Sequence, residues 1–155
     1  MRKVMMAMVM TVAAAVLTAG TSFAAEKDDV LAVVKKCSDA FNKGDAKAAF
    51  AVATDEMSII DEFPPYEWHG GGAFAKWFAD YDANAKKEGI TDGTVALGKA
   101  KHVDVTGDRA YAVINATYTW KLKGKPQKET NATWTFTLLR TKDGWRINGW
   151  TWSKP

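Results

Sequence analysis

The second half of this chain constrains the fold most, because it has the pattern of four long β-strands joined by short turns. These strands are expected at residues 95–105, 109–121, 129–140 and 145–152. Apolar and polar residues alternate along them, so one face of the sheet is predicted to be buried and the opposite, Thr-rich face to be solvated or paired with another subunit. In the last strand the apolar register changes between Ile147 and Trp150, which predicts a bulge at Gly149.

The first half has helical periodicity instead. Helices are expected at residues 28–43, 45–53 and 73–87, with one strand at residues 57–63 between the second and third. Helices followed by consecutive strands are typical of the α+β class. We therefore expect three N-terminal helices packed on a curved antiparallel sheet.

The N-terminus has the pattern of a secretory signal peptide. Arg2 and Lys3 precede an apolar run at residues 4–19, and small residues at Ser22 and Ala24 favour cleavage after Ala24. The predicted organisation is therefore a signal peptide at residues 1–24 and a single domain at residues 25–155. The segment looks bacterial, so a periplasmic or secreted protein is expected.

Charge and cysteine content exclude some functions. The whole chain carries 21 basic and 18 acidic residues, and removing the signal peptide leaves 19 − 18 = +1. This balance predicts neither a nucleic-acid-binding nor a membrane-surface protein. A single cysteine excludes an internal disulfide. Cys37 shares a helical face with Val30 and Val34, which predicts a buried residue, and an intermolecular bridge or a reactive thiol is left open.

Asp61 is the clearest candidate for chemistry. In the strand at residues 57–63 it shares a face with Met57 and Ile59, whereas Glu62 is expected on the opposite face, towards water. Burial of a lone carboxylate raises its pKa, which suits a general base. In the alternative interpretation, Asp61 hydrogen-bonds the turn at Pro64-Pro65.

The order of these elements resembles the nuclear transport factor 2-like (NTF2-like) superfamily, and most closely its SnoaL-like and ketosteroid-isomerase-like branch. The resemblance covers residues 28–152. It is carried by AFNKGD at 40–45, IIDEFPPYEWHG at 59–70, AFAKWFADYDA at 73–83, GDRAYAV at 107–113 and DGWRINGWTW at 143–152. It implies a cystatin-like cone whose mouth holds a ligand, and a homodimer formed through the outer sheet face.

The resemblance also bears on Asp61. Ketosteroid isomerases carry a catalytic Asp nine residues before a Gly, and Asp61 and Gly70 have this spacing. The family's oxyanion donors align instead with Cys37 and Phe136, which are unsuited to that role. Steroid isomerase chemistry is therefore not expected. Tyr66, Tyr118 or His102 could supply another donor, but the sequence does not place them.

Other motifs predict little chemistry. His69 and His102 are the two histidines, and their spacing to Asp61 and Glu62 fits no metal-site pattern, so no metal and no cofactor are expected. The glycines at 70–72 precede a helix and could bind an anion there, although flexibility before the helix is the preferred interpretation.

Aromatic residues are the remaining signal, because they are numerous for one small domain. Most should be core residues, and a few should line the mouth of the cone. The residues predicted to contact a small apolar or aromatic ligand are Tyr66, Trp68, Trp77, Tyr81, Tyr118, Trp120 and Trp134.

Three functional hypotheses follow. The first is an exported domain that binds a small ligand in an aromatic pocket near Asp61. The second is a SnoaL-like enzyme that uses Asp61 as general base on a carbonyl-containing small molecule. The third is an interaction module that dimerises through its sheet.

Overall fold

The structure is a computed structural model that describes the backbone of residues 13–155 and the side chains of residues 24–155. The basic residues and the first part of the apolar run in the predicted signal peptide lie outside the described residues. The elements, in chain order, are α1 (Ala13–Asn42), α2 (Ala46–Ala51), β1 (Ala53–Ile60), β2 (Glu67–Gly71), α3 (Ala73–Glu88), β3 (Ile90–Thr106), β4 (Arg109–Leu122), β5 (Lys125–Thr141) and β6 (Gly144–Ser153).

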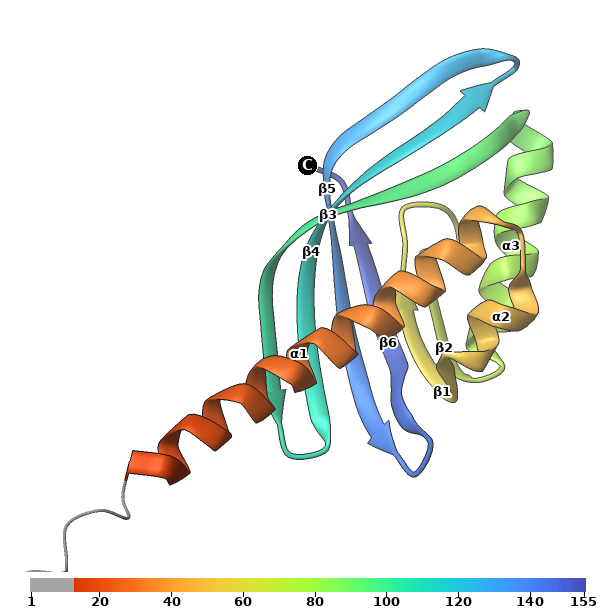
Figure 1. Cartoon of the computed structure of the whole chain (residues 1–155). Helices are drawn as coiled ribbons and strands as arrows, with labels where there is room; N and C mark the ends of the chain where they lie inside the picture. The colour runs from red at the N-terminus through yellow and green to blue at the C-terminus, as the bar shows by residue number, and fades with distance from the viewer. Residues whose placement is uncertain (1–12) are drawn as a thin grey trace, which may run out of the picture.

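The six strands form one curved sheet in the order β2-β1-β6-β5-β4-β3. β1 runs parallel to β6, and every other neighbouring pair is antiparallel. All three helices lie on the same side of the sheet (Figure 1). The α+β prediction, with three helices packed on a curved and mostly antiparallel sheet, is confirmed.

Strand β2 is the element that the sequence does not predict. It is short and ends in glycines, which have low β propensity. Its pairing with β1, for example Ser58 opposite His69, makes it a strand. Tertiary hydrogen bonding therefore overrides a weak local preference here.

The helices begin and end near the predicted residues, with one exception. α1 starts at Ala13 instead of residue 28, and its first turns extend beyond the sheet (Figure 1). At its other end, Asn42 makes two hydrogen bonds with the backbone of Val95 on β3, of 2.8 and 2.7 Å. Asp45 caps α2 by accepting a hydrogen bond from the backbone N–H of Ala48.

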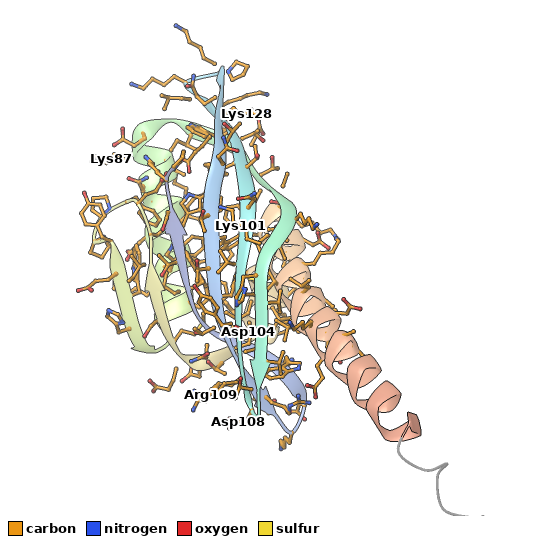
Figure 2. All side chains as sticks on the ribbon, turned by 90° about the vertical axis from the view of Figure 1, so that its left-hand side faces the viewer. Lys87, Lys101, Asp104, Asp108, Arg109 and Lys128 are labelled. Carbon is orange, nitrogen blue, oxygen red and sulfur yellow. The ribbon has the colours of Figure 1, made fainter. Side chains whose placement is uncertain are left out.

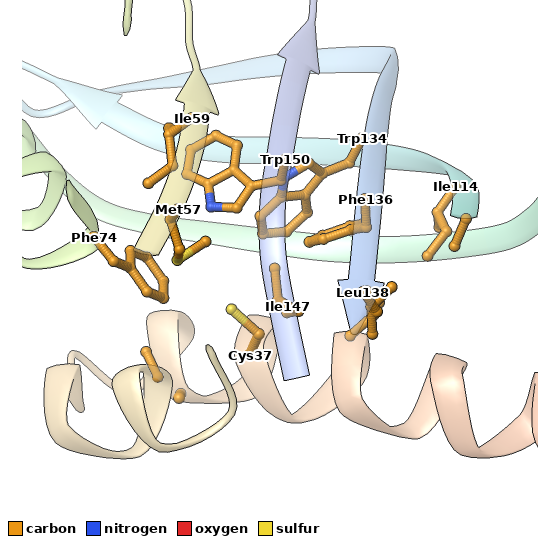
Figure 3. Packing of buried hydrophobic residues seen from close by; sticks show 14 of the residues in the cluster. Cys37, Met57, Ile59, Phe74, Ile114, Trp134, Phe136, Leu138, Ile147 and Trp150 are labelled. Carbon is orange, nitrogen blue, oxygen red and sulfur yellow. The ribbon is translucent and has the colours of Figure 1, made fainter. Parts of the chain in front are cut away.

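The core fills the space between the helices and the concave face of the sheet. Figure 3 shows Cys37 on α1 below Ile147, with Phe136 and Trp150 above them. Cys37 is buried, as predicted, and burial raises the pKa of its thiol to about 12. A thiol that stays protonated is a poor nucleophile.

The predicted bulge in β6 is present, one residue from the expected position. Leu138 pairs with Ile147 and Thr137 with Gly149, so Asn148 is the extra residue. It allows Ile147 and Trp150 to be buried on the same face. Gly149 is required by space, because a Cβ there would lie 2.9 Å from the backbone oxygen of Ser58.

The opposite face of the sheet is polar. Figure 2 views this side and shows Lys101 and Asp104 on it, with Asp108 and Arg109 near the end of the β3–β4 hairpin. No helix covers this face in the part of the chain from residue 13 onward.

Candidate functional site

An aromatic pocket of about 360 Å³ opens between α3, the strands β4 to β6 and the loop after β1. Its sheet wall comprises Tyr118, Trp120, Trp134, Trp150 and Trp152. Its helical wall comprises Phe41 at the end of α1 and Trp77 and Tyr81 on α3. The volume falls within the range of small-molecule sites, which are concave and mostly apolar.

Asp61 is the half-buried carboxylate of this pocket. It directly follows β1, and its Oδ2 accepts a hydrogen bond of 2.8 Å from the indole Nε1 of Trp77. Its Oδ1 accepts one of 2.7 Å from the backbone N–H of Glu62. Burial nevertheless outweighs these bonds and raises the pKa of Asp61 from its ordinary 3.8 to about 6.

The interpretation that Asp61 hydrogen-bonds the turn is also met in part. Its backbone N–H donates to the carbonyl of Tyr66 over 3.0 Å, which closes the loop that contains Pro64 and Pro65. Asp61 thus has a loop-forming backbone and a carboxylate that faces the pocket.

Glu62 lines the same pocket, contrary to the expectation that it lies on the opposite face from Asp61, although it is exposed to water there, as expected. The physical reason is that β1 ends at Ile60, so strand alternation no longer applies to these two residues. The Glu62 side chain is 28% exposed, and its Oε2 lies 3.3 Å from Nζ of Lys154. Desolvation and the nearby Glu129 raise the pKa of Glu62.

Two tyrosine hydroxyls add polar groups where the helical wall of the pocket meets the sheet wall. The hydroxyl of Tyr81 on α3 is 2.7 Å from that of Tyr118 on β4. Burial raises the pKa of both groups, and the charge of Asp61 raises each further. Both hydroxyls therefore remain protonated near neutral pH, and because one of them donates to the other, one O–H of the pair is left to donate to a ligand.

Five of the seven aromatics predicted to contact a ligand line the pocket, namely Trp77, Tyr81, Tyr118, Trp120 and Trp134. The other two lie elsewhere. Tyr66 is 56% exposed in the loop after β1. Trp68 on β2 is buried and donates a hydrogen bond of 2.7 Å to Asp80.

The prediction omitted several lining residues. Phe41 and Phe63 have the sequence pattern of ordinary core positions, and Lys154 lies beyond the last strand. Trp150 and Trp152 belong to β6, where the bulge obscures the pattern. Alternation along β6 after Gly149 was the available signal for Trp152.

Tightly packed aromatic rings join the sheet wall of the pocket to its helical wall. Trp150 meets Trp77 edge-to-face at 5.0 Å and Trp134 edge-to-face at 5.7 Å. The indole N–H groups of Trp134 and Trp150 are buried without a hydrogen-bond acceptor in the described part of the chain. Edge-to-face contacts of this kind stabilise aromatic clusters.

Positions aligned with the isomerase oxyanion donors are core residues. Cys37 is 2% exposed and Phe136 is fully buried, and neither lines the pocket. Of the donors that the sequence could not place, Tyr118 lies in the pocket, whereas Tyr66 and His102 do not. His102 is exposed on β3, where its Nε2 lies 2.6 Å from Asp104.

Across residues 24–155, no group of three or more His, Cys, Asp and Glu side chains has an arrangement that could hold a metal ion. Within the described helices, none is both long and apolar enough to cross a membrane.

Residues 30–155 match the SnoaL-like domain, a stretch that includes the C-terminal part of α1 from residue 30 onward and every later element. The chain belongs to the SnoaL-like domain family. The SnoaL-like domain has the NTF2-like, cystatin-like fold, as solved structures show.

Three of these structures illustrate the likeness. An NTF2-like protein from Novosphingobium aromaticivorans aligns with a TM-score of 0.72 at 18% identity, over 93% of this chain and 91% of that one. An NTF2-like superfamily protein from Salmonella enterica aligns with a TM-score of 0.71 at 17% identity, over 85% of this chain and 92% of that one. A ketosteroid isomerase-like protein from Erwinia carotovora atroseptica aligns with a TM-score of 0.65 at 20% identity, over 83% of this chain and 95% of that one.

No curated protein matches the sequence. At identities of 20% or less, the similar structures establish the fold of this SnoaL-like domain alone. One fold hosts many functions, so the function has to be argued from the site.

Proposed function

We propose that this SnoaL-like domain is an exported binding protein for a small molecule with an apolar or aromatic body. The observation that carries the proposal is the pocket of about 360 Å³, whose walls are aromatic and whose polar groups are a few side chains including Asp61. Aromatic walls favour a flat apolar body, and sparse polar groups orient it.

Ligand binding is tested by calorimetry and thermal shift of the protein without residues 1–24 against a broad set of small aromatic metabolites. Trp120→Ala removes one ring of the sheet wall. Tyr111→Ala removes an aromatic side chain from the other face of the same strand, where Tyr111 is 43% exposed. We expect the first variant to weaken binding by about tenfold or more and the second to leave it unchanged. Absence of any binder across the set contradicts the proposal.

Export is the second part of the proposal and is supported by the signal-peptide pattern. Expression of the full chain in a Gram-negative host should place the protein in the periplasmic fraction. Mass spectrometry should then find Ala25 as its first residue. A protein that keeps residues 1–24 and stays in the cytoplasm contradicts export.

We also propose a second candidate function, general-base catalysis by Asp61 on a carbonyl-containing small molecule. The observation that favours it is the pKa of about 6 for a carboxylate that lines a pocket together with a hydrogen-bonded pair of tyrosine hydroxyls. A base with such a pKa is ionised at neutral pH and retains useful proton affinity.

Hydrogen–deuterium exchange tests this candidate. NMR would follow exchange at the carbon next to the carbonyl of aromatic ketones in D2O. Asp61→Asn should reduce any exchange that the wild-type protein catalyses by about 10²-fold or more. Asp80→Asn, a carboxylate outside the pocket, is the matched control. Equal exchange rates in wild type and a folded Asp61→Asn variant contradict the candidate.

A further inference from the structure

Three acidic side chains converge on one wall of the pocket from separate parts of the chain. Asp61 and Glu62 line it after β1. Glu129 on β5 accepts a hydrogen bond of 3.0 Å from the indole Nε1 of Trp152, a pocket residue. Glu129 also lies within hydrogen-bonding reach of Glu62, and its charge acts on Asp61 as well.

A bulge in β5 brings Glu129 to this wall. Ala116 pairs with Ala132, and the next inward residue of β4, Tyr118, pairs with Glu129 instead of Thr130. The extra residue is accommodated at Asn131, whose φ is +63°. Strict alternation from Ala132 would direct Glu129 to the outer face, so the bulge reverses its side.

Positive charge on this wall is scarce. Lys154 is the one basic residue among those that line the pocket in the described part of the chain, and it already pairs with Glu62. Its side chain is 61% exposed, so solvent weakens its effect. Among residues 24–155 Asp61 has no cationic partner, and both hydrogen bonds to its carboxylate come from neutral N–H groups.

The aromatic walls also favour a positively charged ligand. Tyr118 and Trp120 stack at 4.8 Å between ring centroids, and Trp152 meets Tyr118 edge-to-face at 6.3 Å. Aromatic faces carry negative electrostatic potential and attract cations. An anionic ligand would meet carboxylates and ring faces together, and both disfavour it.

From this convergence we propose that the pocket takes an organic cation, an ammonium group on an apolar or aromatic body. The ammonium group lies by Asp61, Glu62 and Glu129, and the body lies between the sheet wall and α3. This inference rests on the proposed binding function and specifies the chemical class of its ligand.

Calorimetry with three probes of one size tests the inference on the protein without residues 1–24. The probes are 2-phenylethylammonium, 2-phenylethanol and phenylacetate, at neutral pH and low salt. We expect the cation to bind about tenfold tighter than the alcohol, and phenylacetate to bind more weakly than both. The cation's advantage should shrink as salt increases.

Variants locate the preference. Glu62→Gln and Glu129→Gln each remove one carboxylate from the wall and should reduce the cation's advantage over the alcohol several-fold. Glu67→Gln removes a carboxylate from the exposed part of β2 and should leave that ratio unchanged. The alcohol's own affinity in each variant reports whether the pocket is still folded.

The outcomes separate the two proposals. If 2-phenylethanol or phenylacetate binds as tightly as 2-phenylethylammonium, the cation inference is overturned and the binding function stands. If the cation binds preferentially but Glu62→Gln and Glu129→Gln leave its advantage intact, the assignment to this wall is overturned. If none of the three binds at millimolar concentration, the cation inference is overturned, and the metabolite screen then decides the binding function.

Discussion

The hydroxyl groups of Tyr81 and Tyr118 lie 2.7 Å apart, although one residue is on α3 and the other on β4. This hydrogen bond joins the helical wall of the pocket to the sheet wall. It holds the two protonated hydroxyls near Asp61, whose charge contributes to the raised pKa of both.

Removing one of these hydroxyls should destabilise the protein. Tyr118→Phe leaves the Tyr81 hydroxyl without its partner, so we expect the free energy of unfolding to fall by about 1 kcal/mol. Urea denaturation measures the change. Tyr111→Phe, on the exposed face of the same strand, is the control and should have no measurable effect. Equal effects of the two variants would show that the hydroxyl pair contributes nothing to stability.

Gly93 should be sensitive to substitution because it packs against both hydroxyls. A Cβ at this position would lie 2.5 Å from the Tyr118 hydroxyl and 2.6 Å from that of Tyr81. Gly93→Ala should therefore cost about 1–3 kcal/mol in stability. In a Tyr81→Phe/Tyr118→Phe background the cost should be smaller. The same cost in both backgrounds would rule out the hydroxyls as its cause.

Asp61 should make stability fall as pH rises. The carboxyl group of Asp61 has a pKa of about 6 in the folded protein, against an ordinary value of 3.8. At pH values between these two, the folded protein therefore binds more protons than the unfolded chain. The contribution is present below about pH 4 and lost above about pH 6, and the shift corresponds to at most about 3 kcal/mol.

Asp61→Asn isolates this effect because the amide does not titrate in this range. Between pH 4 and pH 7, wild-type stability should fall relative to that of the variant, as measured by urea denaturation at both values. Asp80→Asn serves as control, because Lys76 and Trp68 hold the pKa of Asp80 below its usual value. Parallel pH profiles for wild type and Asp61→Asn would contradict the prediction.

The sheet-face homodimer remains a prediction, and one charge should disrupt it. Thr135 lies centrally on the outer face, between Val113 on β4 and Thr151 on β6. Light scattering should find a dimer for the wild-type protein and a monomer for Thr135→Glu, because burying an unpaired carboxylate in the interface would cost on the order of several kcal/mol of desolvation free energy. Asp108→Asn, at the hairpin end, should leave the dimer intact. A monomeric wild type at high concentration rules out this interface.

Much of the fold could be predicted because its signals are local. The apolar stripe of α3, the Asp45 cap and the alternation along β4 each lie within one continuous segment. Strand β2 could not be predicted, since its glycine-rich residues form a strand only by pairing with β1.

The candidate site was predicted in part for the same reason. The five predicted aromatics that line the pocket are positions on amphipathic elements, and Asp61 directly follows one. Glu62 was assigned the wrong side because the strand ends one residue before Asp61. Periodicity assigns a side only while regular structure continues.

By itself, the sequence determined the class of fold, the order of its elements and the aromatic, acid-bearing character of the segments that build the pocket. Only the tertiary structure decided which side chains meet. The bulge at Asn131 turns Glu129 towards Glu62, and the curvature of the sheet brings Tyr118 to Tyr81. The physical reason is that the meeting of these side chains depends on register shifts and on packing between segments far apart in the chain. Neither produces a periodic pattern of apolar residues within one segment.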